Sequence, residues 1–136
     1  KAYWVKVHEL PEGTKTSRGS HIKTLLQISA NEEITTVMAL QEFSEDKYIF
    51  MATRKGIVKK VRTSDFSNAK TRGIIALNLG TNDKLISSIL TNGDNDVVLL
   101  SRSGNALRYH ENEVRAMGRS SRGVTGMKLS KDDELV

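Results

Sequence analysis

Apolar and polar residues alternate in short runs along this chain, and the runs recur at a nearly constant spacing. GIVKKVRTSDF, residues 56–66, begins with glycine, alternates apolar with basic residues, and ends on an acidic and an apolar residue. GNALRYHENEV, residues 104–114, repeats this frame at an offset of 48 residues, and KAYWVKVHEL, residues 1–10, fits it without the glycine at an offset of 56. Period-two alternation predicts strands, so one strand-forming unit occurs three times.

A second unit recurs between the copies of this frame. It carries an Arg-Gly pair at 18–19, 72–73 and 122–123, followed by an apolar run and an acidic turn: SANEEI, GTNDKLI or SKDDELV. YIFMATRKG and VVLLSRSG precede the frame glycines and predict a strand that ends in a tight turn. Runs rich in branched residues, such as KTLLQI, GIIALNL and DVVLL, suit strands as well, and only NEVRAMG resembles a helical turn.

Together the two units predict an all-β fold of propeller-like blades, with about four antiparallel strands in each unit of about 50 residues. The repeats predict the end of a blade in residues 1–12, whole blades over 13–66 and 67–114, and the start of another over 115–136. A closed propeller has typically about 4–8 blades. We therefore expect an excerpt of a larger disc, or terminal halves that complete each other.

Charge follows the repeat, although the net charge of the chain is only +5. Residues 50–72 carry a net +6 and residues 101–128 a net +4, whereas residues 29–49 carry −4 and residues 73–100 carry −2. In a radial array, equivalent loops lie on equivalent edges. The sequence therefore predicts one basic edge and one acidic edge.

A basic stripe at blade-to-blade intervals suits duplex DNA, since each cation near a phosphate displaces a condensed counterion. Such contacts position a duplex and read no sequence. No helix suited to the major groove and no zinc finger is evident, and the aromatic content of 5% is too low for a base-stacking platform. The alternative is a solvated charged face whose lysines protect exposed strand edges.

The residues of catalytic and metal sites are mostly missing. Cysteine is absent, the three histidines are far apart, and no Gly-x-Ser-x-Gly occurs, so neither a metal site nor an acyl-transfer nucleophile is expected. Gly118 and Gly123 have the spacing of a P-loop, but Val124 and Thr125 stand where Lys and Ser/Thr are needed. Three tyrosines and the Asp-Asp pair in SKDDELV have ordinary strand or turn settings. We expect no catalytic residue in this chain, no membrane span and no secretory signal.

FMATRKGIVKKVRTSDF, VRAMGRSSRGVTGMKLSKDDELV and KVHELPEGTKTSRGSHI resemble the C-terminal domain of the DNA gyrase A subunit, and the resemblance covers essentially the whole chain. It implies a β-pinwheel, a usually six-bladed disc that exchanges strands between neighbouring blades and wraps duplex DNA around its basic perimeter. It also implies a cytoplasmic, nucleoid-associated bacterial parent enzyme: an ATP-dependent type IIA topoisomerase that introduces negative supercoils. ATP and Mg²⁺ are then used elsewhere in the holoenzyme, which pairs gyrase A with gyrase B subunits.

One hallmark of the resembled family is absent. The heptapeptide Gln-Arg-Arg-Gly-Gly-Lys-Gly belongs to the first blade of such domains, and Gly118–Gly123 is at most a degenerate counterpart. The related subunit of topoisomerase IV, which lacks that heptapeptide, therefore stays open. So does a protein-interaction propeller that docks a partner through acidic loops such as QEFSEDK, residues 41–47.

The basic hairpins and Arg-Gly loops supply the candidate DNA contacts. Successive side chains of a strand face opposite ways, so Lys59 and Lys60 cannot both face DNA from one flat strand. The backbone amides of the Arg-Gly loops are further candidate donors to phosphate. The predicted DNA-binding residues are Arg18, Arg54, Lys55, Lys59, Lys60, Arg62, Arg72, Arg102, Arg108, Arg119 and Arg122.

Overall fold

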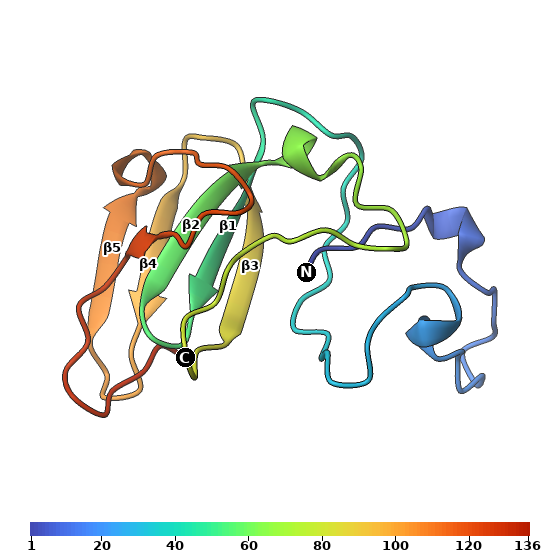
Figure 1. The fold of residues 1–136 in the computed structure, drawn as a ribbon, viewed down its shortest axis with the longest axis horizontal. Helices are drawn as coiled ribbons and strands as arrows, with labels where there is room; N and C mark the ends of the chain where they lie inside the picture. Colours follow the sequence, from blue (N-terminus) through green and yellow to red (C-terminus); the bar gives the residue numbers. More distant parts are fainter.

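The computed structural model describes residues 1–136, and its strands all lie in the C-terminal two thirds of the chain (Figure 1). Short 3₁₀ helices, labelled η, are the only helical elements, and none is long and apolar enough to cross a membrane. The elements are η1 Val7–Glu9, η2 Ile22–Thr24, β1 Tyr48–Thr53, β2 Ile57–Arg62, η3 Thr63–Phe66, β3 Leu85–Thr91, β4 Asp96–Leu100, β5 Ala106–His110, η4 Glu111–Glu113 and β6 Val124–Thr125.

The strands form two antiparallel sheets, as an all-β propeller-like fold requires. One sheet has the order β3-β1-β2-β6, and the other pairs β4 with β5. β6 closes the first sheet although the whole β4–β5 hairpin lies between it and β3 in the sequence. The four-stranded sheet therefore takes strands from more than one repeat, whereas β4 and β5 form a hairpin within one. In this strand exchange, Ile57 and Val58 of β2 pair with Thr125 and Val124 of β6.

The same exchange occurs near the N-terminus in reduced form. Ala2 forms an isolated antiparallel bridge with Ile74, and Val58 pairs with Val124. Ala2 and Val58 are equivalent in the repeated frame, and Ile74 and Val124 each follow an Arg-Gly pair. One rule of pairing therefore holds twice: the residue after Arg-Gly pairs not with the frame segment that directly precedes it in the sequence but with the copy before that one.

The ends of the three frame segments also share one local structure. Each segment turns into a 3₁₀ helix at its acidic–apolar end, as η1, η3 and η4, whose first residues are separated by the same 56 and 48 residues as the sequence frames. The turn glycines Gly56 and Gly104 both have positive φ, 85° and 90°. Glycine adopts this left-handed conformation without the steric cost that other residues incur. The predicted repeat and its tight turns are confirmed.

Two apolar clusters cover the two faces of the β1–β2 hairpin. One contains Phe50 and Val58 and packs them against Val97 and Leu99 of β4, so it joins the two sheets. The other, on the opposite face, contains Met51, Val61, Phe66 and Ala76. Because alternate residues of a strand face opposite sides, burial on both faces leaves β2 with almost no exposed position.

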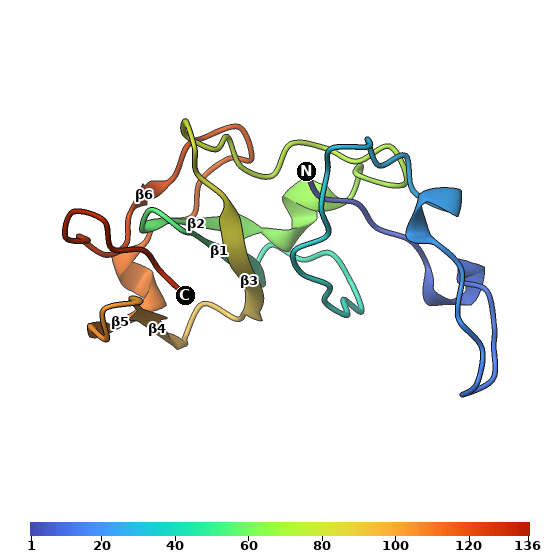
Figure 2. The same ribbon diagram turned by 90° about the horizontal axis from the view of Figure 1, so that it is seen from below.

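Residues 1–46 contain no strand, and several expectations from the sequence are wrong in this segment and beyond it. KTLLQI contributes η2, and GIIALNL contributes only the single bridge at Ile74. The helical turn expected in NEVRAMG lies earlier, in η4. Residues 1–46 do contact distant segments through backbone hydrogen bonds, such as those of Trp4 with Lys70 and Gln27 with Thr71, but these bonds do not form a continuous ladder. In Figure 2 this segment extends away from the two sheets.

Candidate nucleic-acid interface

The Arg-Gly loops present the least engaged cations of the predicted set. Arg18, Arg72 and Arg122 are exposed, and none of their side chains makes a hydrogen bond or an ion pair. Each precedes a glycine of positive φ: Gly19, Gly73 and Gly123 at 73°, 71° and 88°. The three loops therefore combine a left-handed backbone conformation that glycine adopts readily with a guanidinium that has no partner within the chain.

Two of these glycines are required for a second reason. A Cβ on Gly123 would lie 2.5 Å from the carbonyl oxygen of Val58, and one on Gly73 would overlap with the ring of Tyr3. Tyr3 and the segment around Val58 belong to equivalent frame strands. These two glycines thus let the Arg-Gly loops at 72–73 and 122–123 lie directly on the frame segments that contain Tyr3 and Val58, where the pairing between repeats occurs.

The cations at the β1–β2 turn make hydrogen bonds and an ion pair within the chain. Arg54 donates from Nη2 to the carbonyl of Asn82 at 2.7 Å, and its Nε lies 3.6 Å from Glu134. Lys55 donates to the carbonyl of Thr81 at 2.6 Å. Both cations lie at the surface but are tied to the neighbouring acidic turn.

Two further arginines of the predicted set have acidic partners, and one has none. Arg102 pairs with Glu134, and Arg108 lies 3.8 Å from Asp96. Exposed pairs of this kind contribute at most about 1 kcal/mol each, so a phosphate could replace the acid. Arg62, exposed at the end of β2, has no hydrogen bond or ion pair for its side chain.

Lys59 lies inside the molecule. Its side chain is fully buried, and Nζ donates to the carbonyls of Ala76 at 2.8 Å and Ser121 at 2.9 Å, and also to that of Arg119. Burial, and secondly the charge of Arg119, lower the pKa of Lys59 to about 8. A cation without a carboxylate partner is costly inside a protein, and here three carbonyl dipoles offset part of that cost.

Lys60 is buried on the other face of β2. Its Nζ donates to the carbonyl of Glu111 at 2.9 Å, lies 3.6 Å from a carboxylate oxygen of the same residue, and sits 5.0 Å from the ring centre of Tyr48. Glu111 is itself fully buried and accepts hydrogen bonds from the Thr91 hydroxyl and the Asn95 amide. This ion pair links β2 of one sheet to η4 beside the other.

Lys59 and Lys60 therefore do not belong to the predicted DNA-binding surface. Strand alternation allows one of the two to face DNA, but both faces of β2 are covered, so neither ammonium is accessible. Sequence reasoning misses this because lysine is rarely found fully buried. Their carbonyl partners belong to loops far away in sequence.

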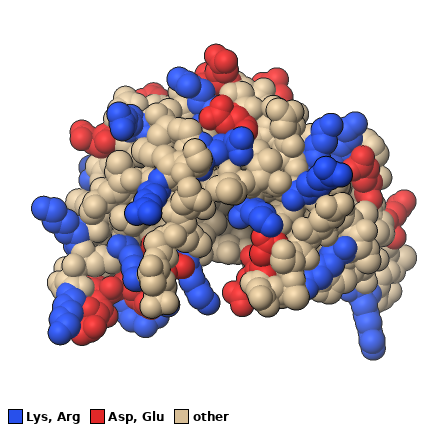
Figure 3. Space-filling model, in the orientation of Figure 1, with Lys and Arg blue, Asp and Glu red and all other residues tan.

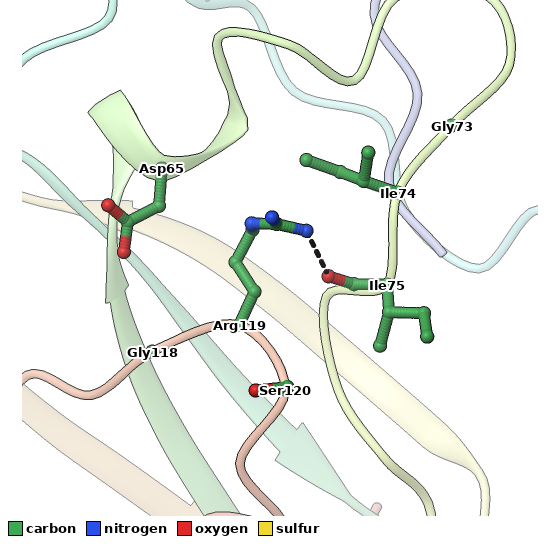
Figure 4. A pocket seen from close by; sticks show the side chains of 7 residues that line it. All are labelled: Asp65, Gly73, Ile74, Ile75, Gly118, Arg119 and Ser120. Atoms are coloured by element: carbon green, nitrogen blue, oxygen red, sulfur yellow. Dashed lines mark hydrogen bonds between the residues drawn. The ribbon is translucent and has the colours of Figure 1, made fainter.

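Arg119 lies at a shallow pocket between two repeats (Figure 4). Its Nη1 donates to the carbonyl of Ile75 at 3.1 Å, and Asp65 lies on the other side of the guanidinium. The pocket has a volume of about 650 Å³ and is also lined by Gly73 and Gly118. Arg119 is half-buried and ties its loop to the neighbouring repeat, so it is less free than Arg122.

The carboxylates of the three acidic turns accept hydrogen bonds from other groups of the chain, a structural role that the sequence does not reveal. Asp83 accepts a hydrogen bond from the Lys55 amide at the β1–β2 turn, and Asp133 accepts one from the Ser103 amide at the β4–β5 turn. Hydroxyl donation, first from Ser103, lowers the pKa of Asp133 to about 2. In the first turn, the Ser29 amide and then the Tyr3 hydroxyl lower the pKa of Glu32 to about 2.

Opposite charges are interspersed on the surface. On the face in Figure 3, Lys and Arg lie at many points around the outline with Asp and Glu among them. This face is therefore not a single basic edge. The unpaired arginines of the Arg-Gly loops are a more specific feature than the charge pattern of this face.

Antiparallel sheets built from a repeat of about 50 residues, with strands exchanged between successive units, define a propeller-like class of β-proteins. The chain matches the family model described as "DNA gyrase C-terminal domain, beta-propeller" over residues 1–41, 47–92 and 95–136. The chain belongs to this family. The second and third matched segments begin one residue before β1 and β4, at the 48-residue offset of the repeat.

Individual relatives agree with the family match. The DNA gyrase A protein of Treponema pallidum is 53% identical over 121 residues, which are 89% of this chain and 15% of the relative. A solved C-terminal domain of DNA topoisomerase IV superposes with a TM-score of 0.86 at 32% identity, covering 96% of this chain and 41% of that one. A gyrase A C-terminal domain gives 0.78 at 28% identity, covering 88% and 40%. The chain thus spans a small part of the gyrase proteins it resembles.

Proposed function

We propose that this chain binds duplex DNA without reading its sequence and helps to bend it around the perimeter of a larger disc. The observation that carries the proposal is the repetition of an exposed, unpaired arginine at Arg18, Arg72 and Arg122, each at the same place in its repeat. Cations at regular intervals can lie close to phosphates along a DNA backbone, because the phosphates are also regularly spaced. Arg62 and the weakly paired Arg54, Lys55, Arg102 and Arg108 would add to the set, and Arg119 would border it.

The absence of a reading element supports binding that is independent of sequence. The longest helical element in residues 1–136 is the four-residue η3, which is too short to lie in a major groove and present side chains to bases. Phosphate contacts fix register and orientation but carry no sequence information. Bending a site of 20–30 base pairs costs on the order of 1–6 kcal/mol, which many weak phosphate contacts together would offset.

The parent protein would be the A subunit of DNA gyrase, a type IIA topoisomerase that couples ATP hydrolysis to negative supercoiling. ATP and Mg²⁺ would act in other parts of an assembly with gyrase B subunits, and the assembly would work on the DNA of the bacterial cytoplasm. The family match and the gyrase A relatives support this assignment. The blade limits at 13–66 and 67–114 are proposed as the repeat units of its wrapping domain.

The A subunit of topoisomerase IV is a second candidate parent. It is favoured by one observation: the topoisomerase IV domain superposes with the higher of the two TM-scores, 0.86 against 0.78. Purified full-length protein separates the two candidates. A gyrase parent introduces negative supercoils into relaxed plasmid with ATP, whereas a topoisomerase IV parent only relaxes supercoils and unlinks circles.

The binding proposal is tested with Arg18→Glu, Arg72→Glu and Arg122→Glu combined in the full-length protein. Filter binding to long linear duplex, repeated at several salt concentrations, should show weaker binding and a smaller log–log salt slope. The slope should fall by about 0.9 for each phosphate that is no longer neutralised, nearly 3 in all. The matched control changes Lys15, Lys23 and Lys131 to Glu, three exposed lysines outside the predicted set.

The control carries the same change in total charge as the test variant. If both variants lose the same affinity and slope, total charge and not the Arg-Gly position governs binding, and the assignment of these arginines is wrong. Topoisomer distributions after ligation of nicked plasmid then test bending. The parent protein should shift the linking number with a fixed sign, and the triple Arg variant should shift it less.

A further inference from the structure

The buried ammonium of Lys59 holds the loop of residues 118–123 from its inner side. Nζ donates to the carbonyls of both Arg119 and Ser121 in this loop, and to Ala76 in the neighbouring repeat. Between them, the carbonyl of Ser120 accepts from the side-chain amide of Asn78. Three consecutive carbonyls of this loop are therefore all bound by side chains of other segments, two of them by the buried Lys59 and one by the exposed Asn78.

This arrangement fixes where the loop's own donors point. The chain has no cis peptide bond, and in a trans peptide the C=O and the following N–H point in opposite directions. Because the carbonyls of Arg119 and Ser121 face Nζ of Lys59, the N–H groups of Ser120 and Arg122 face away from it. Neither N–H group makes a hydrogen bond within the chain, and both residues are exposed.

A third donor lies beside these two. The guanidinium of Arg122 has no hydrogen-bond or ion-pair partner. Outward N–H groups in a loop backed by positive charge form an anion-binding concavity, and arginine recognises phosphate through several parallel N–H donors. A peptide whose carbonyl is bound to a cation is also more polarised, which strengthens donation from its N–H.

We propose that Lys59 is a positioning residue that sets the loop of residues 118–123 as a binding site for one phosphate of a nucleic-acid backbone. The phosphate accepts from the N–H groups of Ser120 and Arg122 and from the Arg122 guanidinium. This inference rests on the proposed DNA-binding function and adds a mechanism to it. Lys59 takes part without touching the ligand.

The equivalent loop around Arg72 lacks this device. Its carbonyls at Lys70 and Thr71 accept from backbone amides, those of Trp4 and Gln27. The loop around Arg72 lies on the frame segment of residues 1–10, where the residue equivalent to Lys59 is Tyr3, which is not cationic. The loop at Arg122 is therefore expected to bind phosphate more strongly than the loop at Arg72, although both carry Arg-Gly.

The test uses the full-length protein in its holoenzyme, with long linear duplex as the probe. Lys59→Met removes the buried charge with little change of volume, Asn78→Ala releases only the middle carbonyl, and Arg122→Gln removes the guanidinium. For each variant, duplex affinity is measured over a series of salt concentrations, and melting is followed separately. The double variant Lys59→Met/Arg122→Gln completes a double-mutant cycle for duplex binding.

We expect Lys59→Met to reduce the log–log salt slope by about 0.9, as Arg122→Gln does, because each variant neutralises one phosphate fewer than the parent. The double variant should lose no more than either single one, since both act on the same phosphate. A residue that only stabilises the fold would lower the melting temperature and leave the slope of the folded protein unchanged. That result for Lys59→Met, or full additivity in the double variant, overturns the proposal.

Asn78→Ala tests the same idea if Lys59→Met does not fold. Asn78 is exposed, and its loss should weaken duplex binding and speed amide hydrogen exchange in residues 118–123 without lowering melting. Parent-like affinity together with faster exchange in this variant overturns the proposal. If the parent protein itself shows no salt-dependent duplex binding, the proposed DNA-binding function is wrong. That outcome differs from the results that would overturn only the role of Lys59, because those results are differences between the variants and a parent protein that binds duplex.

A second experiment compares inorganic phosphate with duplex DNA as the ligand and measures amide hydrogen exchange in the loop. With a backbone phosphate as the ligand, duplex DNA slows exchange of the loop amides, and millimolar inorganic phosphate does not. Protection by inorganic phosphate alone, with none by duplex, would mean that the loop takes a free anion and would overturn the nucleic-acid assignment.

Discussion

The β1–β2 and β4–β5 hairpins arise from the same repeated frame but have opposite environments. β1 and β2 are buried over nearly their whole length, whereas β4 alternates between exposed and buried positions and β5 is mostly exposed. Both hairpins have a glycine turn of positive φ, a closing 3₁₀ helix and an aspartate bound to the turn amide. Local sequence therefore sets the hairpin, and something else sets its burial.

The difference comes from neighbours supplied by other repeats. β2 receives β6 and the residues that follow it, and β1 receives β3. Within residues 1–136, β5 pairs only with β4, and the residue after β4, Ser101, forms an isolated bridge with Leu135. The burial of each hairpin within this chain is thus set by the segments from other repeats that pack on it, and not by the hairpin's own sequence pattern.

The largest expected contrast is between Phe50 and Val98, which occupy equivalent positions of β1 and β4. Phe50 is 3% exposed and Val98 is 64% exposed. Phe50→Ala should lower the free energy of unfolding by about 3–5 kcal/mol because it leaves a cavity between the sheets. Val98→Ala should change it by no more than about 0.5 kcal/mol. Urea denaturation of both variants measures the contrast, and equal losses would show that β4 is as buried as β1 in solution.

A smaller contrast is expected between the two turn glycines. Alanine at either position adopts a left-handed backbone at a cost of about 1–2 kcal/mol. At Gly56 its Cβ would also lie 2.5 Å from the carbonyl of Met127, whereas at Gly104 nothing lies within 4 Å. Gly56→Ala should therefore destabilise the protein by a further 1–3 kcal/mol, roughly the cost of overpacking. Thermal melting of the pair measures this, and equal effects would mean that the segment after β6 does not cover the β1–β2 turn.

The smallest contrast is in how the free energy of unfolding depends on pH. The buried Lys59 of β2 titrates, whereas its equivalent in β5 is Leu107, which carries no charge. The pKa of Lys59 falls from 10.5 in the unfolded chain to about 8 in the fold. Between these values the unfolded chain binds more protons, so the free energy of unfolding rises with pH. From pH 7.5 to 9.5 the parent protein should gain at most about 2 kcal/mol relative to Lys59→Met. Parallel stability curves for the two proteins over this range would show that Lys59 titrates normally.

The repeat and its turns can be predicted from sequence because they are local. Glycine at 56 and 104, the acidic–apolar ends and the Arg-Gly pairs each have a conformational cause within a few residues. Strand exchange is implied only by the family resemblance. The alternation pattern identifies a strand but not its neighbour, so it predicts a strand at KTLLQI, where none forms.

The candidate site can be predicted less fully than the fold. Arg18, Arg72 and Arg122 lie exposed where the Arg-Gly pattern places them, and whether they bind phosphate stays a prediction. The burial of Lys59 and Lys60 cannot be derived, because their partners at Ser121 and Glu111 are more than 50 residues away. A lysine in an amphipathic strand is normally an exposed cation, and only the tertiary structure reveals these two as internal donors.

The sharing of strands between repeats also determines how such a disc must come apart. In ordinary repeat arrays each unit keeps its own strands, so a terminal unit can fray while the rest persists. Here the β1–β2 hairpin loses an edge when β6 detaches, and β6 belongs to a later unit, beyond the β4–β5 hairpin. Units linked in this way resist peeling one by one. A disc that bends stiff DNA would thereby carry the load as a single mechanical body and melt in a single cooperative step.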